Sequence, residues 1–554
     1  MPNEQTPLLR DRTDGQYGVG SEDVPTRTQS ETHPTPDLPF RVVAYTCTAL
    51  WCVTFLCAQD ATIVAMLLGN ISSAFHASEK SSWIGSTFLL SVCCASPLFG
   101  RLCDIIGKKK SILIALLCFS IGTLFCASAP SMTQFLVART IAGIGAGGLV
   151  TAISVIMTHL VPLHSRGIYQ GLTNIVFGLG VGTGAPVGGV LNDTVGWRGA
   201  FYIQVPILVI TFFALMFLLE HDEPTHAPQE PSLLKRLKDV DMLGLVVFSI
   251  APITALWAMD RVSVQDKSLT DPYVLTGLCT SIAALVLFYF VERHGAAVPL
   301  VSLDIYALRS GWSSLWANFF VSVGLFAYNY NFPLFFQTVG GLSASTVGVR
   351  MMPASIALSV GSLLAGFYMR ATGRYYWYNA GCMLLAAIFT IPAAFFNTNP
   401  ATIAPFVYNI PQAFGCAGML TCTLLALINC VDKSTVGVTT GMNYLFRTTG
   451  QVLGVSVSGA ILQSLLARNL RYWIVGPDAE ALIAKIRHEA TIIPSLPPQF
   501  QGPALQSYAN ALQCVFWLVL LAQTIAFVMC LYIEDKPLKP AGGVQLPSDE
   551  EEVL

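Results

Sequence analysis

Residues 42–68 read VVAYTCTALWCVTFLCAQDATIVAMLL, a stretch long and apolar enough to cross a bilayer as one helix. It contains a single acidic residue, Asp60, well inside the run. A carboxylate in hydrocarbon costs about 2.5–3.5 kcal/mol on insertion scales, so such a residue usually faces a bundle interior or a water-filled path. Asp60 is therefore the first candidate for a group that carries a proton or binds a cation.

The composition of the whole chain indicates a polytopic membrane protein. Of its 554 residues, 53% are hydrophobic and 11% are charged, whereas soluble domains carry about 25% charged residues. The net charge of −2 does not suggest a nucleic-acid partner. The 15 cysteines fall mostly in apolar stretches and show no zinc-type spacing, so no metal site and no cofactor is predicted.

Apolar stretches of membrane-spanning length recur along the chain and predict about fourteen transmembrane helices. These are residues 41–68, 82–100, 111–129, 133–158, 168–191, 199–219, 241–259, 272–292, 312–336, 345–369, 377–396, 402–428, 436–466 and 508–533. Lysine and arginine are concentrated in the short loops on one side of these helices. By the positive-inside rule that side is cytosolic, and both termini are predicted to lie on it.

Several catalytic signatures are missing from the sequence. There is no G-x-x-x-x-G-K-[ST], H-E-x-x-H or G-x-S-x-G motif, so the chain is not predicted to be an enzyme. A bundle of many spans without an ATPase motif is typical of a transporter driven by a gradient. A transport-inactive nutrient receptor is a weaker alternative, and an intramembrane enzyme is weaker still.

Residues 100–109 read GRLCDIIGKK and join the second and third predicted spans. Gly100 and Gly107 permit a tight turn and close helix approach, and Asp104 can face helix N-termini or a basic partner. Lys108 anchors the cytosolic face. The stretch resembles the G-x-L-x-D-x-x-G-[RK]-[RK] loop of the major facilitator superfamily, which implies a gating role for these four residues.

The fourth and fifth spans carry further resemblances to this superfamily. Residues 139–148 read RTIAGIGAGG and resemble its R-x-x-x-G-x-G signature, which implies that Arg139 is a proton-relay partner; the alternative is that it snorkels to the interface. Residues 174–189 read NIVFGLGVGTGAPVGG and resemble its antiporter signature, with Ala185 in place of the usual glycine. The signature residues are Gly180, Gly184, Pro186, Gly188 and Gly189. Tight helix packing alone is the alternative explanation for them.

Other stretches narrow the resemblance. QDATIV at 59–64 and WRGAFYIQVP at 197–206 are similar to signatures of fourteen-helix drug:proton antiporters, with a glutamine replacing the usual asparagine in the second. GFYMRATGR at 366–374 looks like a decayed copy of the loop signature, as expected if two six-helix halves are repeats. SWIG at 82–85 and QGLTNIVFGLG at 170–180 look most like fungal vacuolar amino-acid transporters.

The resemblance implies an all-α membrane protein of the superfamily's fold, with two six-helix bundles at 41–219 and 312–533 and an inserted helix pair at 241–292. It implies import of the basic amino acids lysine, histidine and arginine into the fungal vacuole in exchange for protons. The alternative is a plasma-membrane multidrug or toxin exporter of the same fold. The remaining segments are a disordered cytosolic tail at 1–40, a cytosolic loop at 220–240, a non-cytosolic loop at 468–507 and a cytosolic tail at 534–554.

Few charged groups lie inside the spans, and they define the predicted site. Asp60 would hold either a proton or the cationic group of the substrate, while Arg139 or Arg447 would meet a carboxylate. Polar neighbours on other spans complete the candidate site: Asn174, Asn329, Asn331, Asn443 and Gln451. A packing or snorkelling role explains Arg447 equally well, and a polar helix kink explains Asn329 and Asn331.

Two short motifs concern targeting and modification. Glu4, Leu8 and Leu9 fit an acidic dileucine signal, E-x-x-x-L-L, which predicts a sorting adaptor as a partner and a vacuolar or lysosome-like membrane as the destination. Asn70 and Asn192 lie in N-x-S/T sequons on the predicted non-cytosolic side. Each is either a glycosylation site or a chance match.

Overall fold

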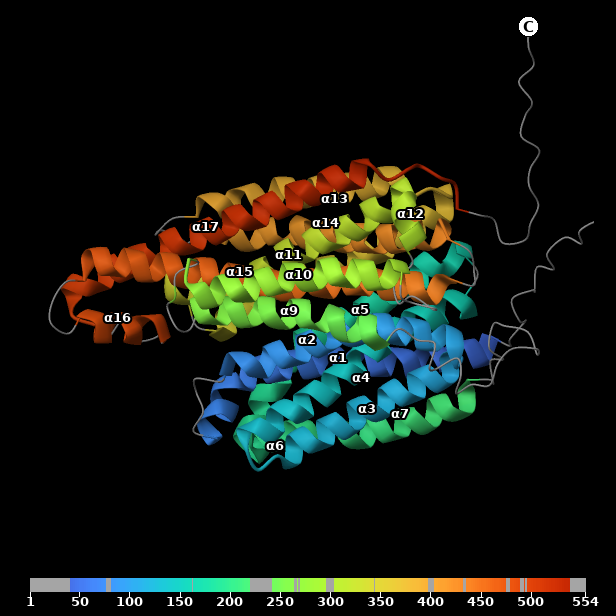
Figure 1. Ribbon diagram of the computed structural model, residues 1–554, viewed down its shortest axis with the longest axis horizontal. Coiled ribbons are helices and arrows are strands. Elements are labelled where there is room, and N and C mark those ends of the chain that lie inside the picture. Colours follow the sequence, from blue (N-terminus) through green and yellow to red (C-terminus); the bar gives the residue numbers. More distant parts are fainter. Residues whose placement is uncertain are drawn as a thin grey trace, which may run out of the picture.

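The computed structural model describes residues 40–75, 81–161, 163–219, 242–263, 270–294, 303–342, 344–396, 403–431, 435–474, 479–488 and 496–538, together with Lys267 and Ile493. These residues are helical almost throughout and contain no strand, which confirms the predicted all-α fold (Figure 1). The first half contains α1 (Phe40–Ala74), α2 (Ser81–Ile105), α3 (Lys108–Ser128), α4 (Met132–Leu160), α5 (Leu163–Val195), α6 (Trp197–Tyr202) and α7 (Gln204–Leu218). Then come α9 (Met242–Ser263), α10 (Pro272–His294), η2 (Leu303–Ala307), α11 (Arg309–Thr338), α12 (Ala344–Thr372), α13 (Tyr376–Thr390), η3 (Ile391–Phe395), α14 (Ala404–Asn429), α15 (Val436–Trp473), α16 (Ala479–His488) and α17 (Pro498–Leu531).

Every predicted span coincides with a described helix. However, fewer than fourteen of these helices are long and apolar enough to cross a membrane. Twelve helices of the described residues are long and apolar enough to cross a membrane. The helices α5 and α9, which cover the predicted spans 168–191 and 241–259, are not among them. Glycine lowers the hydropathy of α5, and the apolar part of α9 covers only Leu243–Met259. The predicted count of fourteen is therefore not confirmed.

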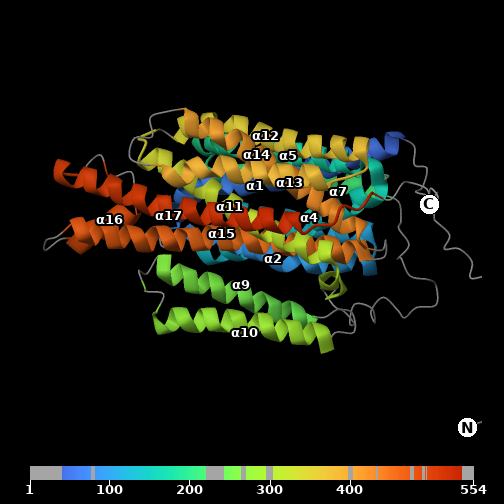
Figure 2. The same cartoon turned by 90° about the horizontal axis from the view of Figure 1, so that it is seen from above.

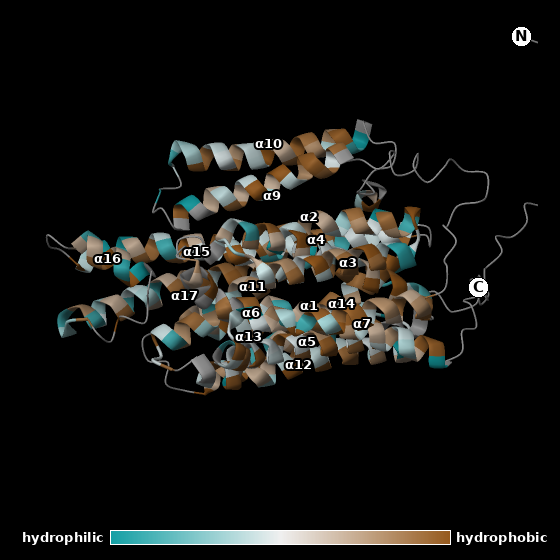
Figure 3. Cartoon of the chain, turned by 90° about the horizontal axis from the view of Figure 1, so that it is seen from below, coloured by the Kyte–Doolittle hydropathy of each residue, from teal (hydrophilic) through white to brown (hydrophobic). Residues whose placement is uncertain are grey.

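The helices run side by side along one long axis (Figure 1). Helices α1–α4, α6 and α7 lie on one side of the molecule, and α11–α15 and α17 lie on the other. The pair α9 and α10 lies at one edge, where α9 packs against α15 and α2 (Figure 2). Hydrophobic residues cover most of each helix, and hydrophilic residues gather mainly towards the helix ends (Figure 3).

Two segments predicted as loop or tail are structured. In the predicted loop 468–507, α16 is a described helix that buries Ile483 and Ile486 in the core of the second half. Residues 534–538 pack across the end of the bundle instead of starting a tail, because the amide of Leu538 donates to Gly373 O at 2.9 Å. Nearby, the Lys536 ammonium lies 2.6 Å from Glu534 and lowers the pKa of that carboxyl.

The glycine-rich helix α5 fits against α1 along one face. A Cβ added at Gly180 would lie 2.6 Å from a backbone carbonyl of α1. One added at Gly184 would overlap the hydroxyl of Thr62 and lie 2.9 Å from Gln59 O. Only glycine allows this approach, so the two glycines fix the segment of α1 that includes Asp60.

The opposite face of α5 meets the second half of the molecule. At 3.6 residues per turn, Gly171, Gly178, Gly182 and Gly189 share this face. A Cβ added at Gly171 would lie 2.7 Å from Cα of Leu363 on α12, and one at Gly178 would lie 2.9 Å from a serine hydroxyl of α12. Additions at Gly182 and Gly189 would meet no described atom within 4 Å. Among these glycines, the close approaches to α12 are therefore at Gly171 and Gly178, in the part of this face nearer the α2–α3 loop.

The difference between the two faces gives a test of helix packing. Gly184→Ala should lower the stability of the purified chain by about 1–3 kcal/mol, because its methyl group overlaps Thr62 in a close-packed contact. Gly182→Ala, two residues away, should change stability by much less, since its methyl enters open space. Thermal unfolding in detergent measures both, and equal losses would contradict the packing described.

Candidate functional site

Asp60 of α1 and Arg139 of α4 form an ion pair inside the first half. Arg139 Nη1 donates to Asp60 Oδ2 at 2.6 Å, and the two residues are 1% and 0% exposed, respectively. The second carboxylate oxygen, Oδ1, and Arg139 Nε have no hydrogen-bond partner among the described residues. The pair is therefore end-on rather than bidentate, and one buried carboxylate oxygen has no hydrogen bond to the described residues.

Neighbouring helices isolate this pair from solvent. The guanidinium of Arg139 lies over the ring of Phe88 on α2, with its carbon 4.2 Å from the ring centroid. The face of α5 with Gly180 and Gly184 supports the same segment of α1. Removing one member of such a pair leaves an uncompensated buried charge, so the two groups depend on each other.

The loop signature lies where α2 meets the start of α15. A Cβ added at Gly100 would lie 2.8 Å from Gly437 O, and one at Gly437 would overlap the Asp104 carboxylate. The carboxylate therefore lies beside the first turn of α15, whose partial positive charge favours an anion there. Gly107 has φ 87°, which suits glycine, and it precedes α3. Lys108 begins α3.

Polar contacts join the two halves on the same side. Asn174 Nδ2 of α5 donates to Ser362 Oγ of α12 at 2.6 Å and approaches Thr421 Oγ1 of α14 at 3.4 Å. Ser154 Oγ of α4 lies 3.1 Å from the Tyr444 hydroxyl of α15. Together with the close approach at Gly100, these contacts close the end of the molecule that contains the loop signature.

Arg447 differs from Arg139 because it has no acidic partner or hydrogen bond among the described residues. It is half-buried on α15, and its guanidinium carbon lies 5.9 Å from the ring centroid of Tyr444. Asn443 and Gln451 lie one turn before and one turn after it. Asn443 is 2% exposed, and its carbonyl oxygen has no partner in the described part of the chain. These three predicted site residues therefore form a polar strip along one helix.

Other predicted residues lie on α11 and α5. Asn329 is exposed on α11, and its place in the substrate site stays a prediction. Two positions later in the helix, Asn331 faces inward and donates to Ser458 Oγ at 3.0 Å, a contact within the second half. Gly188 packs against Ile63 of α1, while a Cβ added at Gly189 would meet no described atom.

Some predictions fall partly or wholly outside the described residues. Both sequons lie in helices, Asn70 in α1 and Asn192 in the last turn of α5, and glycosylation remains a prediction. The side chains of Asn70 and Pro186 are outside the description, as are Glu4, Leu8 and Leu9 and the segment 220–240. No cluster of three or more metal-binding side chains occurs in the described residues.

Sequence reasoning missed the residues that join the halves. Ser154, Tyr444, Ser362 and Thr421 are ordinary polar residues in apolar spans, and no motif distinguishes them. Gln412 of α14 was missed as well, although it is 1% exposed and both polar atoms of its side chain lack a partner among the described residues. The side-chain amide of Gln412, inside a predicted apolar span, was the feature of the sequence that could have indicated this residue.

Comparison with known proteins identifies related transporters. A family profile described as Major Facilitator Superfamily matches residues 50–455. "Multidrug resistance protein fnx1" of Schizosaccharomyces pombe is 36% identical over 88% of this chain and 91% of its own length. "Vacuolar membrane amino acid uptake transporter fnx2" of the same yeast is 33% identical over 87% of this chain and 83% of its own length. "Vacuolar basic amino acid transporter 1" of Saccharomyces cerevisiae is 31% identical over 74% and 76%.

A solved structure shares the fold. The proton:xylose symporter XylE superposes with a TM-score of 0.56 at 13% identity and covers 90% of this chain and 98% of its own. At this identity the similarity concerns the arrangement of the helices alone.

A double-mutant cycle tests the dependence of Asp60 and Arg139 on each other. Asp60→Asn and Arg139→Gln should each lower stability by about 3–5 kcal/mol, since each leaves a buried charge unpaired. The double variant should recover most of that loss, because it removes both charges. Thermal unfolding in detergent measures the cycle, with Arg350→Gln as a control arginine outside any ion pair of the described residues. Simple addition of the two single losses would contradict a coupled pair.

Proposed function

The chain belongs to the major facilitator superfamily of membrane transporters, and on this premise we propose that it exchanges protons for basic amino acids across the fungal vacuolar membrane. The observation that supports this proposal most directly is the buried, end-on ion pair of Asp60 and Arg139. Its free carboxylate oxygen is a position that either a proton or a cationic side chain can occupy.

Competition for Asp60 is the core of the proposed mechanism. A proton or a cationic substrate side chain that reaches Oδ1 neutralises the carboxylate and weakens its attraction for Arg139. Since a proton and a substrate cannot both neutralise the same carboxylate, binding of one favours release of the other, which is the requirement for antiport.

Arg447 is the proposed second anchor for the substrate. An amino acid brings a carboxylate as well as a cation, and this half-buried arginine has no acidic partner among the described residues. Amides one turn away, at Asn443 and Gln451, supply further hydrogen-bonding groups on the same helix. In this proposal Asp60 binds the cationic end of the substrate and Arg447 binds its carboxylate.

The proposed movement is rocking of two bundles, residues 41–219 and 312–533, about a seam that contains α5. The polar contacts at Asn174 and Ser154 join the bundles on the side of the loop signature, where α5 also meets α12. Breaking these contacts while the open part of the α5 face closes would expose Asp60 to the other side. Alternating access of this kind suits two repeats around a central site.

The free energy of the proton gradient is large enough to accumulate the proposed substrate. One pH unit supplies about 1.4 kcal/mol per proton, and each 100 mV supplies about 2.3 kcal/mol per charge. One exchanged proton therefore supports roughly tenfold accumulation for each pH unit.

The second candidate function is drug or toxin efflux at the plasma membrane. The relative named as a multidrug resistance protein favours it, and an aspyridones efflux protein of Neocamarosporium betae is also similar, at 26% identity over 95% of this chain. Both candidate functions share the fold and the proton-coupled site, so the transported substrate and the membrane distinguish them.

Transport into vesicles tests the proposed substrate class. Vacuolar vesicles with an acidic interior and the wild-type chain should accumulate radiolabelled lysine, histidine or arginine roughly tenfold per pH unit. Asp60→Asn should abolish gradient-driven uptake, because its amide neither releases nor takes up a proton in this range. Full gradient-driven uptake by this variant would contradict the role of Asp60.

The variant Asp60→Asn/Arg139→Gln is the folding control for this assay. It removes both buried charges, so its failure to couple uptake to the gradient cannot be attributed to an unpaired arginine. Coupled uptake by the double variant would assign the pair a structural role. Absence of uptake of all three amino acids by wild-type vesicles, together with efflux of a cationic dye from cells, would favour the exporter.

Localisation tests the sorting proposal. A fluorescently tagged chain should reach the vacuolar membrane, and Leu8→Ala/Leu9→Ala should divert it to the cell surface by removing the dileucine pair. Gln5→Ala/Thr6→Ala changes two variable positions of the same motif and should sort normally. Vacuolar delivery of the dileucine variant would contradict the signal, and surface localisation of the wild type would favour the exporter.

A further inference from the structure

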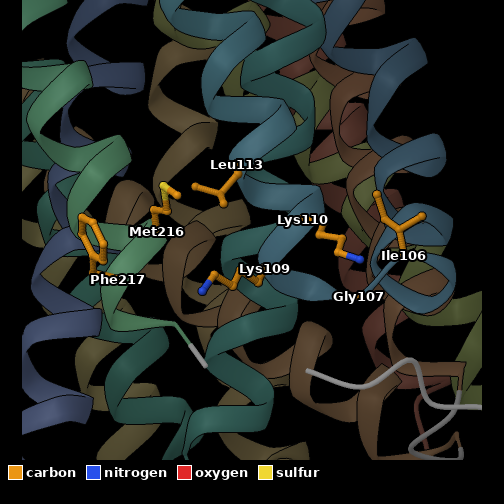
Figure 4. Close-up of a pocket in the computed structure, with 7 residues that line it drawn as sticks. All are labelled: Ile106, Gly107, Lys109, Lys110, Leu113, Met216 and Phe217. Atoms are coloured by element: carbon orange, nitrogen blue, oxygen red, sulfur yellow. The ribbon is translucent and has the colours of Figure 1, made fainter. Parts of the chain in front are cut away.

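A basic pocket lies away from the seam between the two halves. Its volume is about 470 Å³, and its lining includes Lys109, Lys110 and Leu113 of α3 and Met216 and Phe217 of α7 (Figure 4). None of the described residues that line it is acidic. It lies at the same end of the molecule as the loop signature, on the surface where α3 and α7 pack together.

The start of α3 concentrates positive charge at this pocket. Three lysines, Lys108–Lys110, occupy the first turn of the helix, where the helix dipole already favours an anion. Gly107 precedes them and has no side chain to accept a hydrogen bond from the first amides. Lysines here oppose the dipole, so the local charge favours an external anion.

Both lysines of the pocket have ammonium N–H groups that form no hydrogen bond with the described residues. Lys109 Nζ donates to Leu219 O at 2.6 Å and has two further N–H groups. Lys110 is exposed and forms no ion pair or hydrogen bond with the described residues. Figure 4 shows Lys109 extending towards the α7 side and Lys110 towards Ile106 and Gly107.

The other side of the pocket is apolar and faces the membrane. Met216 and Phe217 are 43% and 79% exposed. Above them, exposed apolar residues continue along both helices: Ile114, Leu117, Ile210 and Phe213. In a chain that spans a bilayer, such a surface contacts acyl chains. The pocket therefore joins a cationic group at the membrane edge to a continuous lipid-facing surface.

We propose that this pocket binds one anionic phospholipid. Lys110 holds the headgroup phosphate, the free N–H groups of Lys109 bind further headgroup oxygens on the α7 side, and an acyl chain lies along Leu113, Met216 and Phe217. The predicted cytosolic orientation is consistent with this, since that leaflet is rich in anionic lipid and basic pockets there bind phosphorylated headgroups. A second groove of about 420 Å³ between α12 and α14 has no charged lining residue, so it lacks the means to select a headgroup.

Native mass spectrometry of the purified full-length chain tests the proposal. The probe is dioleoyl phosphatidylinositol 4-phosphate. The wild type should retain one molecule of it, and should retain it more tightly than it retains dioleoyl phosphatidylcholine. Lys110→Gln should weaken this retention about fivefold, equivalent to about 1 kcal/mol for one basic residue near the membrane surface. Arg370→Gln removes an exposed charge from the last turn of α12 and should leave the retention unchanged.

Two further measurements locate the site and identify the source of the phosphate. A derivative with a photoreactive acyl chain should label the peptides that contain Leu113 or Phe217. Soluble inositol phosphate should compete poorly, because it lacks the acyl chain. Equal retention by the wild type and Lys110→Gln, an equal loss in Arg370→Gln, labelling elsewhere, or full competition by the soluble headgroup would each overturn the proposal.

Discussion

The buried ion pair of Asp60 and Arg139 is the constraint on which the rest of the first half depends. Two charges that are almost completely shielded from solvent persist only because each compensates the other. The pair joins α1 to α4 across 79 positions of sequence, and α2 covers it with Phe88. Its end-on geometry pairs the two charges without using every polar atom, so Oδ1 of Asp60 stays without a hydrogen-bond partner among the described residues.

Helix α5 connects this pair to the second half. One of its glycine faces fixes the segment of α1 around Asp60, and the opposite face meets α12. The α12 face makes backbone contact at Gly171, whereas a Cβ added at Gly182 would meet no described atom within 4 Å. A change at the Asp60 pair acts on α1 and α4, and both α5, through Asn174, and α4 itself, through Ser154, contact the second half.

Much of this arrangement could be predicted from the sequence, and the misses have clear physical reasons. Hydropathy locates membrane spans because bilayer thickness sets how long an apolar helix must be. That length can be recognised in each segment of the sequence without knowledge of the others. The partner of Asp60 is different, because proximity across 79 positions depends on tertiary packing, and only the family resemblance indicated Arg139. Asn329 is exposed and Asn331 is buried because of the rotation of α11 about its axis. Since α11 is only weakly amphipathic, its sequence does not indicate which face points inward. Similarly, α16 is short and amphipathic, so hydropathy does not distinguish it from a loop.

The loop signature at 100–109 and the lysine that follows it divide their contacts between two environments. Gly100 and Asp104 lie on the end of α2 that faces α15, inside the seam. Lys109 and Lys110 lie a few positions later on α3, where the pocket faces lipid. Gly107, with its positive φ, makes the turn between these surfaces. Since so short a segment leaves little slack, any movement of α2 against α15 also moves the lysines relative to the membrane surface. The proposed anionic lipid, held by those lysines, would therefore bind one position of the seam more tightly than the other, and the charge of the surrounding leaflet would enter the transport equilibrium.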